Sequence, residues 1–318
     1  MKKRDLGTTG IAVSELAFGG VEIGMPYGIG VNSEADMPTE PEAIRLLHAA
    51  TEAGVNFFDT ARLYGASETI MGKAFRDRRG QVVIETKCRH LRDPDGRLPD
   101  GATLKKRIST SLLESLTALE TYYVDIFMLH QADLGILENE EIPAVFADLK
   151  AQGVIRSTGV STYSVEETRK AIETGVWDVV QLPFNLMDQR QAALFALARE
   201  NGVGIVIRSV LMKGLLTSRG RRLHPALAEV ETHIRQFDEL VLEPVPDLST
   251  LAVRFALAFP EVSSILVGID KPAYLHQALA AVNGPGLAPE IMSRARNLAY
   301  PDPQFLNLPH WDRMGWLT

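Results

Sequence analysis

The chain repeats one pattern eight times, a short β-branched segment followed by an amphipathic one, and this repeat restricts its fold more than any other feature. Buried parallel strands separated by helices produce such a pattern. We expect strands over 16–18, Asn56–Asp59, Val82–Lys87, Val124–His130, Ile155–Ser161, Val179–Pro183, Gly204–Arg208 and Ser264–Val267. Eight such units in 318 residues predict a closed α/β (β/α)8 TIM barrel. An open Rossmann sheet fits less well, because no Gly-x-Gly-x-x-Gly follows an early strand.

The segments between these strands carry helix signals. The predicted helices run from Thr39 and over Glu68–Phe75, Leu104–Leu119, Ile142–Ala151, Val165–Thr174, Gln189–Glu200, Leu248–Phe259 and Ala273–Val282. Thr39 and Glu42 form a capping box, and the inner face of that helix would carry Ile44, Leu46, Leu47 and Ala50.

The remaining segments predict a hairpin and long loops. The runs Lys3–Leu6 and Ile11–Val13 flank Gly7-Thr8-Thr9-Gly10, which predicts a hairpin at the N-terminus. Val21–Pro38 and the region after Arg208 are aperiodic and would form long loops on the C-terminal face of the barrel. No break in composition divides the chain, so we expect one domain over residues 1–318.

Composition excludes several classes of function. The net charge is −7, from 33 basic and 40 acidic residues, which disfavours general nucleic-acid binding. No apolar run is long enough to cross a membrane, and no apolar segment follows the basic Met1–Arg4 as in a signal peptide. The single cysteine, Cys88, cannot form an internal disulfide. We therefore expect a cytoplasmic protein whose partner is a small molecule.

Polar residues follow the predicted strands at the rim where barrel enzymes place their chemistry. They are Gly20, Asp59, Lys87, His130, Ser161, Gln181 and Arg208, with Tyr64 in the turn after Asp59. Each alone would fit an ordinary role, such as a helix cap, a packed tyrosine or a solvated charge. Seven strand ends converging on one rim favour a joint role in chemistry.

The residue types in this set suit reduction of a carbonyl group. A phenol titrates near ~10 in water, and a lysine ammonium beside it stabilises the phenolate. A carboxylate paired with that lysine offsets the cost of its burial. A neutral histidine beside the phenol can orient a carbonyl oxygen while the phenol supplies a proton. The set lacks an electron source, which a nicotinamide would supply.

Six motifs in register carry a family resemblance. They are Asp59-Thr60-Ala61…Tyr64-Gly65…Ser67-Glu68, Thr86-Lys87, Leu129-His130-Gln131, Gly159-Val160-Ser161, Gln181…Asn185 and Gly214-Leu215-Leu216. In this order the chain resembles the aldo-keto reductases from Asp5 to about Ala281. The resemblance implies a (β/α)8 barrel that uses NAD(P)H without metal or flavin. It implies Tyr64 as general acid, Lys87 and Asp59 as the groups that tune it, and His130 as the group that orients the carbonyl.

The resemblance also assigns cofactor residues. Ser161 and Gln181 match the positions that hold the nicotinamide carboxamide, and Arg208 would stack on the nicotinamide. Ser209, Leu211 and Gly214 match backbone sites near the pyrophosphate. Gly20 and Asp59, at the ends of the first two barrel strands, complete the expected set of cofactor residues. Gly268, Lys271 and Gln277 lie in the stretch that contacts the adenosine and its 2′-phosphate.

Three departures from the family pattern concern the cofactor. Thr162 replaces the usual asparagine after the serine, and Ala278 replaces the usual asparagine near the adenine. Asp270 would repel a 2′-phosphate, which only Lys271 could attract. Both NADP(H) and NAD(H) therefore stay open as cofactors.

Loops would decide the substrate, an aldehyde, ketone or aldose, or an alcohol or sugar oxidised in reverse. The candidates are Met25–Ile29, Arg62-Leu63, Arg89-His90, Asp133–Leu137 and the tail Asn307–Trp316, with Thr217–Pro246 as a lid. Two other classes stay open: a Schiff-base aldolase that uses Lys87, and a non-catalytic subunit that senses nicotinamide. The sequence does not indicate an oligomeric state.

Overall fold

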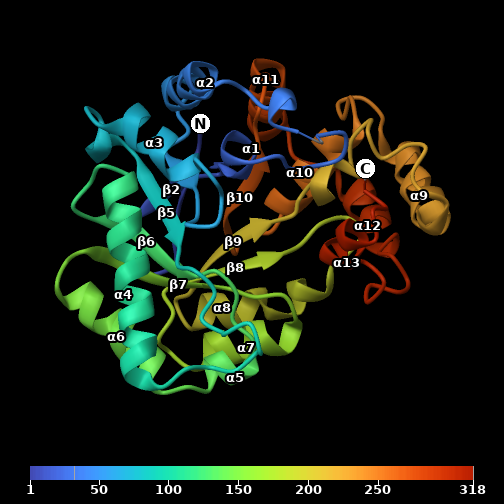
Figure 1. Cartoon of the computed structure of the whole chain (residues 1–318). Helices are drawn as coiled ribbons and strands as arrows, with labels where there is room; N and C mark the ends of the chain where they lie inside the picture. The colour runs from blue at the N-terminus through green and yellow to red at the C-terminus, as the bar shows by residue number, and fades with distance from the viewer. Residues whose placement is uncertain (32, 318) are drawn as a thin grey trace.

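The computed structural model describes residues 1–31 and 33–317 and shows the expected closed barrel. Eight parallel strands form it in the order β10-β3-β4-β5-β6-β7-β8-β9. Their bounds are β3 Leu16–Gly19, β4 Phe57–Asp59, β5 Val83–Lys87, β6 Val124–Leu129, β7 Ile155–Ser161, β8 Val179–Pro183, β9 Gly204–Arg208 and β10 Val262–Gly268. In Figure 1 these strands lie in the centre and the helices surround them. The prediction of a (β/α)8 barrel is confirmed.

The helices that cover the barrel follow the predicted segments closely. They are α2 Glu40–Glu52, α3 Ser67–Phe75, α4 Gly101–Ala118, α6 Glu141–Ala151, α7 Val165–Glu173, α8 Phe195–Glu200, α10 Leu248–Leu257 and α11 Pro272–Asn283. The capping box of α2 is present, because the Thr39 amide and hydroxyl both donate to the Glu42 carboxylate. α4 begins three residues earlier than predicted, since Asp100 accepts the Thr103 amide and caps it. In α2 Ala43 is buried, whereas the predicted inner residue Ile44 is half-buried.

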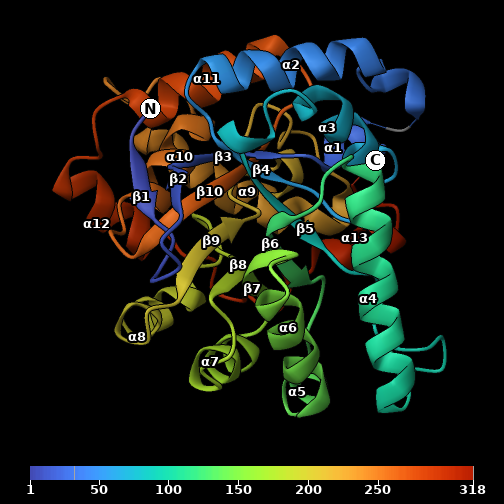
Figure 2. The same ribbon diagram turned by 90° about the vertical axis from the view of Figure 1, so that its left-hand side faces the viewer.

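A hairpin closes one end of the barrel. β1 Lys3–Asp5 pairs antiparallel with β2 Ala12–Ser14, as predicted. Leu6, Ile11 and Val13 are buried in one apolar cluster with residues that point into the barrel. Figure 2 shows this hairpin at one end of the barrel and α13 (Leu308–Arg313) at the other. Only the far end is therefore open to a ligand.

The interior of the barrel changes from apolar to polar along its axis. Successive side chains of a strand point to opposite faces, so residues two apart share the interior. Near the hairpin the interior holds Ala17, Phe57, Val83, Ile126, Met128, Val179 and Val206. Two positions further along the strands, Asp59, Glu85, Gln181 and Arg208 replace apolar residues. The polar layer thus lies at the carboxyl ends of the strands, where the chemistry was expected.

Three segments predicted as irregular contain helices, so those predictions were wrong. Val21–Pro38 contains the short helix α1 (Val21–Gly24) and a 3-10 turn over Glu34–Asp36. The region after β9 contains 3-10 turns and α9 (Ala228–Gln236), which buries Val230 and Ile234 one helical turn apart. The third segment, the predicted loop Asp133–Leu137, contains the short helix α5 (Leu134–Leu137), which Asp133 caps. Another helix, α12 (Pro289–Asn297), precedes α13. The predicted helix Gln189–Glu200 begins as a 3-10 turn over Arg190–Leu194.

Within the described residues, no helix is long and apolar enough to cross a membrane.

Candidate active site

A buried ion pair lies at the centre of the polar layer. Lys87, at the end of β5, is fully buried, and its ammonium donates to the Asp59 carboxylate of β4 and to the Thr60 carbonyl, 3.1 Å away. Burial disfavours the charged ammonium, but attraction from Asp59, Tyr64 and Glu85 outweighs it and raises the pKa of Lys87. Lys87 is therefore a permanent cation in this site.

Glu85 is a second buried acid beneath this pair, and sequence reasoning missed it. Its side chain is fully buried, and it accepts a hydrogen bond from the Gln181 amide, which also donates to Asp59 Oδ1 at 3.0 Å. Burial, and then repulsion from Asp59, raise the pKa of Glu85 well above its ordinary value. Burial and this repulsion thus favour the protonated form of Glu85. A signal existed, because Glu85 lies two residues before Lys87 and must share its face of the strand.

Tyr64 reaches this pair from the turn between β4 and α3. The Lys87 ammonium lies 5.0 Å from the centroid of the Tyr64 ring. Burial raises the pKa of Tyr64 to about 12, although the Lys87 charge acts to lower it. The sequence predicted the lowering effect of Lys87 correctly, but burial outweighs it. Tyr64 is therefore fully protonated at neutral pH and can serve as a proton donor.

His130 follows β6 and lies beside the phenol. Its ring is 5.4 Å from the Tyr64 ring, centroid to centroid, and nearly perpendicular to it. Burial and the nearby Lys87 charge lower the pKa of His130 to about 3, so the imidazole is neutral. Its Nδ1 is buried and has no hydrogen-bond partner in the part of the chain that the structure describes. The structure thus brings the four expected catalytic residues, Asp59, Tyr64, Lys87 and His130, into one cluster.

The cluster forms the inner wall of a cavity of about 680 Å³, a volume typical of cofactor and substrate sites. The cavity runs from the barrel interior to the segment Asp247–Ser249 and to Gln277 on α11. Most of the expected cofactor residues line it: Asp59, Ser161, Gln181, Arg208, Ser209, Leu211, Gly214, Gly268 and Gln277. Two expected residues are not part of this wall. Gly20 instead donates its amide to the Asp59 carbonyl, and Lys271 is an exposed residue next to Asp270.

Comparison with known proteins identifies the family. The model of the "Aldo/keto reductase family" matches residues 15–299, most of the chain. The chain belongs to the aldo/keto reductase family. It is 31% identical to the L-galactose dehydrogenase of Arabidopsis thaliana over 298 residues, covering 88% of this chain and 87% of that protein. It is 30% identical to the NADH-specific methylglyoxal reductase of Escherichia coli over 311 residues, covering 89% of this chain and 94% of that protein.

A solved reductase structure has the same fold. The holo form of an aldo-keto reductase from Bacillus halodurans superposes with a TM-score of 0.78 and 27% identity, covering 94% of this chain and 96% of that one. Other relatives that match along most of their length are described as voltage-gated potassium channel β subunits. The family is one of NAD(P)-dependent oxidoreductases, and the chain is accordingly an oxidoreductase of this family.

The loop Ser209–Gly214 fits the phosphates of the dinucleotide that this family uses. Its backbone is left-handed at Ser209, with φ 61°, and again at Met212, Lys213 and Gly214, with φ 47°, 58° and 105°. Turns of alternating handedness form concave backbone surfaces that bind anions, and non-glycine residues in such conformations concentrate at binding sites. Ser209, Leu211 and Gly214 all face the cavity. The Lys213 ammonium adds positive charge to this reductase loop.

The far end of the cavity, away from the catalytic cluster, carries both an acid and a guanidinium. Asp270 and Tyr274 line this end, and Arg219 donates to the Tyr274 hydroxyl at 2.8 Å. Gln277 donates to Asp247 Oδ2 at 2.9 Å. The acid at position 270 thus faces the cavity, whereas Lys271 lies outside its wall.

Arg208 and Thr162 have partners within the protein. The Arg208 guanidinium lies 4.1 Å from the centroid of the Tyr163 ring and donates to the Thr162 carbonyl at 2.8 Å. The Thr162 hydroxyl is buried and bonds to the Thr168 hydroxyl. Thr162 therefore does not replace the amide that the family usually presents to the cofactor at this position.

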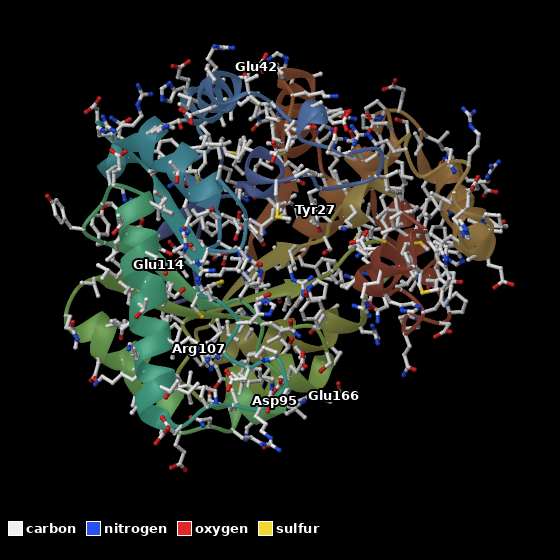
Figure 3. The ribbon with its side chains drawn as sticks, in the orientation of Figure 1. Tyr27, Glu42, Asp95, Arg107, Glu114 and Glu166 are labelled. Carbon is white, nitrogen blue, oxygen red and sulfur yellow. The ribbon has the colours of Figure 1, made fainter. Side chains whose placement is uncertain are left out.

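Residues Tyr27–Ile29, which we call the strap, contact the Ser209–Gly214 loop at the cavity wall. The Ile29 amide donates to the Lys213 carbonyl at 3.1 Å, and Arg219 donates to the Ile29 carbonyl at 3.0 Å. The Lys213 ammonium lies 4.4 Å from the centroid of the Tyr27 ring and forms an ion pair with Asp312 of α13. Figure 3 shows Tyr27 near the centre of the molecule, whereas Glu42 lies on the outer helix α2.

These contacts decide which predicted loops reach the reductase cavity. The loop at Met25–Ile29 does so through Tyr27 and Gly28, and the tail does so through Leu308, Pro309 and Asp312. Arg62 instead pairs with Glu68 and Glu114, and Asp133 pairs with Arg92, so both serve the scaffold. The loop Arg89-His90 also lies outside this wall, although the His90 ring is 5.3 Å from His130. Tyr27 and Glu22 are cavity residues that the sequence did not single out.

Proposed function

We propose that the chain reduces the carbonyl group of an aldehyde, ketone or aldose with a nicotinamide dinucleotide, or oxidises the corresponding alcohol or sugar. The observation that carries the proposal is the cluster of Tyr64, Lys87 and His130 in the wall of a cavity of about 680 Å³. When bound, the dinucleotide supplies or accepts a hydride. Asp59, Ser161, Gln181 and Arg208 would hold its nicotinamide half.

The residues of the cluster would divide the remaining work. His130 is neutral, so one ring nitrogen can donate a hydrogen bond to the carbonyl oxygen of the substrate and polarise it. As the hydride reaches the carbonyl carbon, negative charge develops on this oxygen, and Tyr64 transfers its phenolic proton to it. Lys87 stabilises the phenolate that remains, and Asp59 holds Lys87 in place. In the oxidation direction the same groups accept the proton.

The charge state of Lys87 separates this proposal from a Schiff-base aldolase. An aldolase lysine must lose its proton to attack a carbonyl carbon. Lys87 instead has a raised pKa and donates hydrogen bonds to Asp59 and the Thr60 carbonyl, so its nitrogen lacks a free electron pair. Family membership favours the oxidoreductase in the same way.

For the cofactor we propose NADH at least on equal terms with NADPH. Asp270 lines the adenosine end, where its charge opposes a 2′-phosphate, while Lys271 lies outside the wall. One of the relatives is described as NADH-specific, which supports the same choice. We also propose a cytoplasmic location, because Cys88 is a buried free thiol and the cytoplasm keeps thiols reduced.

The test combines binding and turnover. Both dinucleotides are titrated by nicotinamide fluorescence, and oxidation of each is then followed at saturation with 4-nitrobenzaldehyde and a panel of ketones and aldoses. We expect binding of NADH and turnover of at least one carbonyl. Binding without turnover of any carbonyl or sugar would instead support the nicotinamide-sensing subunit, and absence of binding would overturn both readings.

A further inference from the structure

Glu22 lies in the cavity wall without a role in the cluster described above. It belongs to α1, directly after β3, and its carboxylate packs against Gly268 at the end of β10. A Cβ at position 268 would lie only 1.8 Å from Glu22 Oε1, so any larger residue there would displace the carboxyl group. The chain therefore keeps space for this carboxyl group at the cavity wall.

The carboxyl group of Glu22 is incompletely bonded. Its Oε2 atom is buried and has no hydrogen-bond partner among residues 1–31 and 33–317. A buried polar atom without a partner costs free energy, which a ligand in the cavity would recover by bonding to it. Because Glu22 lines the cavity, a rotation of its carboxyl group would bring this atom to a bound molecule.

The charged groups around Glu22 favour its neutral form. Asp270, after β10, and Asp59, on β4, both repel a negative charge there, and Lys213 attracts it more weakly. The Tyr27 hydroxyl of the strap is the other titratable group that interacts with it. Burial is the largest effect, and it raises the pKa of Glu22 to about 8. At neutral pH the carboxyl group holds a proton and has an O–H to donate.

The position of Glu22 along the cavity identifies what would accept that proton. It lines the cavity together with Asp59, which we assign to the nicotinamide half, and Asp270, which we assign to the adenosine half, and the charges of both act on it. It also interacts with Lys213 of the Ser209–Gly214 loop. The middle of an extended dinucleotide is its pyrophosphate. A neutral acid can donate a hydrogen bond to a phosphate oxygen, whereas an ionised acid repels it.

We propose that Glu22 is a positioning residue that donates its carboxylic O–H to the pyrophosphate of the bound dinucleotide, so that loss of this proton releases the cofactor. The inference rests on the proposed function, because it requires a dinucleotide in this cavity. It makes cofactor affinity, rather than the chemical step, the pH-sensitive property of the protein above neutrality.

The experiment measures dissociation constants of NADH by nicotinamide fluorescence from pH 6 to 9.5. We expect an almost constant Kd below pH 8 and a rise of about tenfold per pH unit above it, because binding then requires uptake of one proton. Glu22→Gln keeps a donor that cannot ionise, so its Kd should stay within about threefold of the wild-type value at pH 7 and lose the alkaline rise. Glu52→Gln, an exposed site on α2, is the matched control and should keep the rise.

Proton uptake gives a second readout that needs no variant. Calorimetric titration at pH 9 in two buffers of different ionisation enthalpy should show uptake of nearly one proton per NADH bound. ADP-ribose, which has the pyrophosphate, should behave alike, and adenosine, which lacks it, should bind without uptake. A pH-independent Kd, or equal alkaline slopes in wild type and Glu22→Gln, would overturn the inference alone. No binding of any dinucleotide at pH 6 to 8 would instead refute the proposed function.

Discussion

Glu85 Oε1 lies 4.0 Å from the Lys87 ammonium, on the same face of β5 and wholly inside the barrel. The ammonium also pairs with Asp59, so two acids share one cation. Burial makes two adjacent carboxylates costly and favours the protonated form of Glu85. The active cluster is therefore a network in which one ammonium serves two acids, and its stability and its chemistry depend on the same lysine.

The variant Lys87→Met should lose both stability and catalytic activity. It leaves the Asp59 carboxylate buried without a cation, which typically costs about 3–5 kcal/mol of unfolding free energy. Urea denaturation measures this loss, and turnover should vanish with it. The double variant Asp59→Asn/Lys87→Met removes the unpaired charge and should regain a large part of the stability but no activity. Equal stability of the single and double variants would contradict the network.

Tyr64→Phe separates proton transfer from binding. Because Tyr64 has a pKa near 12 and donates the proton, its removal should lower kcat by at least about 100-fold, as for other general acids. Dinucleotide Kd, measured by fluorescence, should change little, since the hydroxyl is not needed to bind the cofactor. A variant with near-normal kcat would show that another group supplies the proton.

His130 makes the protein less stable in acid. Its pKa is about 3 when folded and about 6.5 when unfolded, so the unfolded state binds more protons in between. Stability that is fully present above pH 6.5 is therefore lost as the pH falls toward 3. His130→Gln should flatten this part of the curve by up to about 1.4 kcal/mol per pH unit, in urea unfolding series against wild type. Parallel curves would show that the imidazole is charged in the folded protein.

Asp270 should select against NADPH. Asp270→Asn removes a negative charge from the adenosine end of the cavity and should improve the Kd of NADPH relative to NADH by about tenfold, worth about 1.4 kcal/mol. Lys271→Ala is the companion variant, and the sequence predicts that it weakens NADPH more than NADH. Equal losses of the two cofactors in Lys271→Ala would show that Lys271 does not read the 2′-phosphate. An unchanged ratio in Asp270→Asn would remove Asp270 from this role.

Asp312 should control how long the dinucleotide stays. Its ion pair with Lys213 joins α13 to the loop that carries the strap contacts. Asp312→Asn should raise the dissociation rate of NADH several-fold in stopped-flow displacement. The wild-type rate should rise with salt, because Asp312 is partly exposed and the pair is screened. Arg313→Gln, an exposed neighbour in α13, serves as the control and should leave the rate unchanged.

The catalytic cluster could be predicted because strand periodicity is strict. Residues at strand ends, such as Asp59 and Lys87, must meet at one rim once eight units close a barrel. Glu85 could have been included by the same rule. Glu22 could not, since it lies in a stretch without periodicity. The loop Met25–Ile29 was predicted to reach the cavity, but not that Tyr27 would be the residue to do so, because the path of this loop depends on contacts with Lys213 and Arg219. In α9 the spacing of Val230 and Ile234 is typical of a helix, but the other residues of this segment are mostly polar, and the spacing was overlooked.

The N-terminal hairpin also limits the route by which a proton can reach Tyr64. By filling the barrel behind Asp59 and Glu85 with Leu6, Ile11 and Val13, it keeps water away from that side. A phenolate formed at Tyr64 can then be reprotonated only through the mouth that also admits the carbonyl compound. Reprotonation of Tyr64 must therefore wait until the alcohol product has left the cavity, because the proton and the product use the same route.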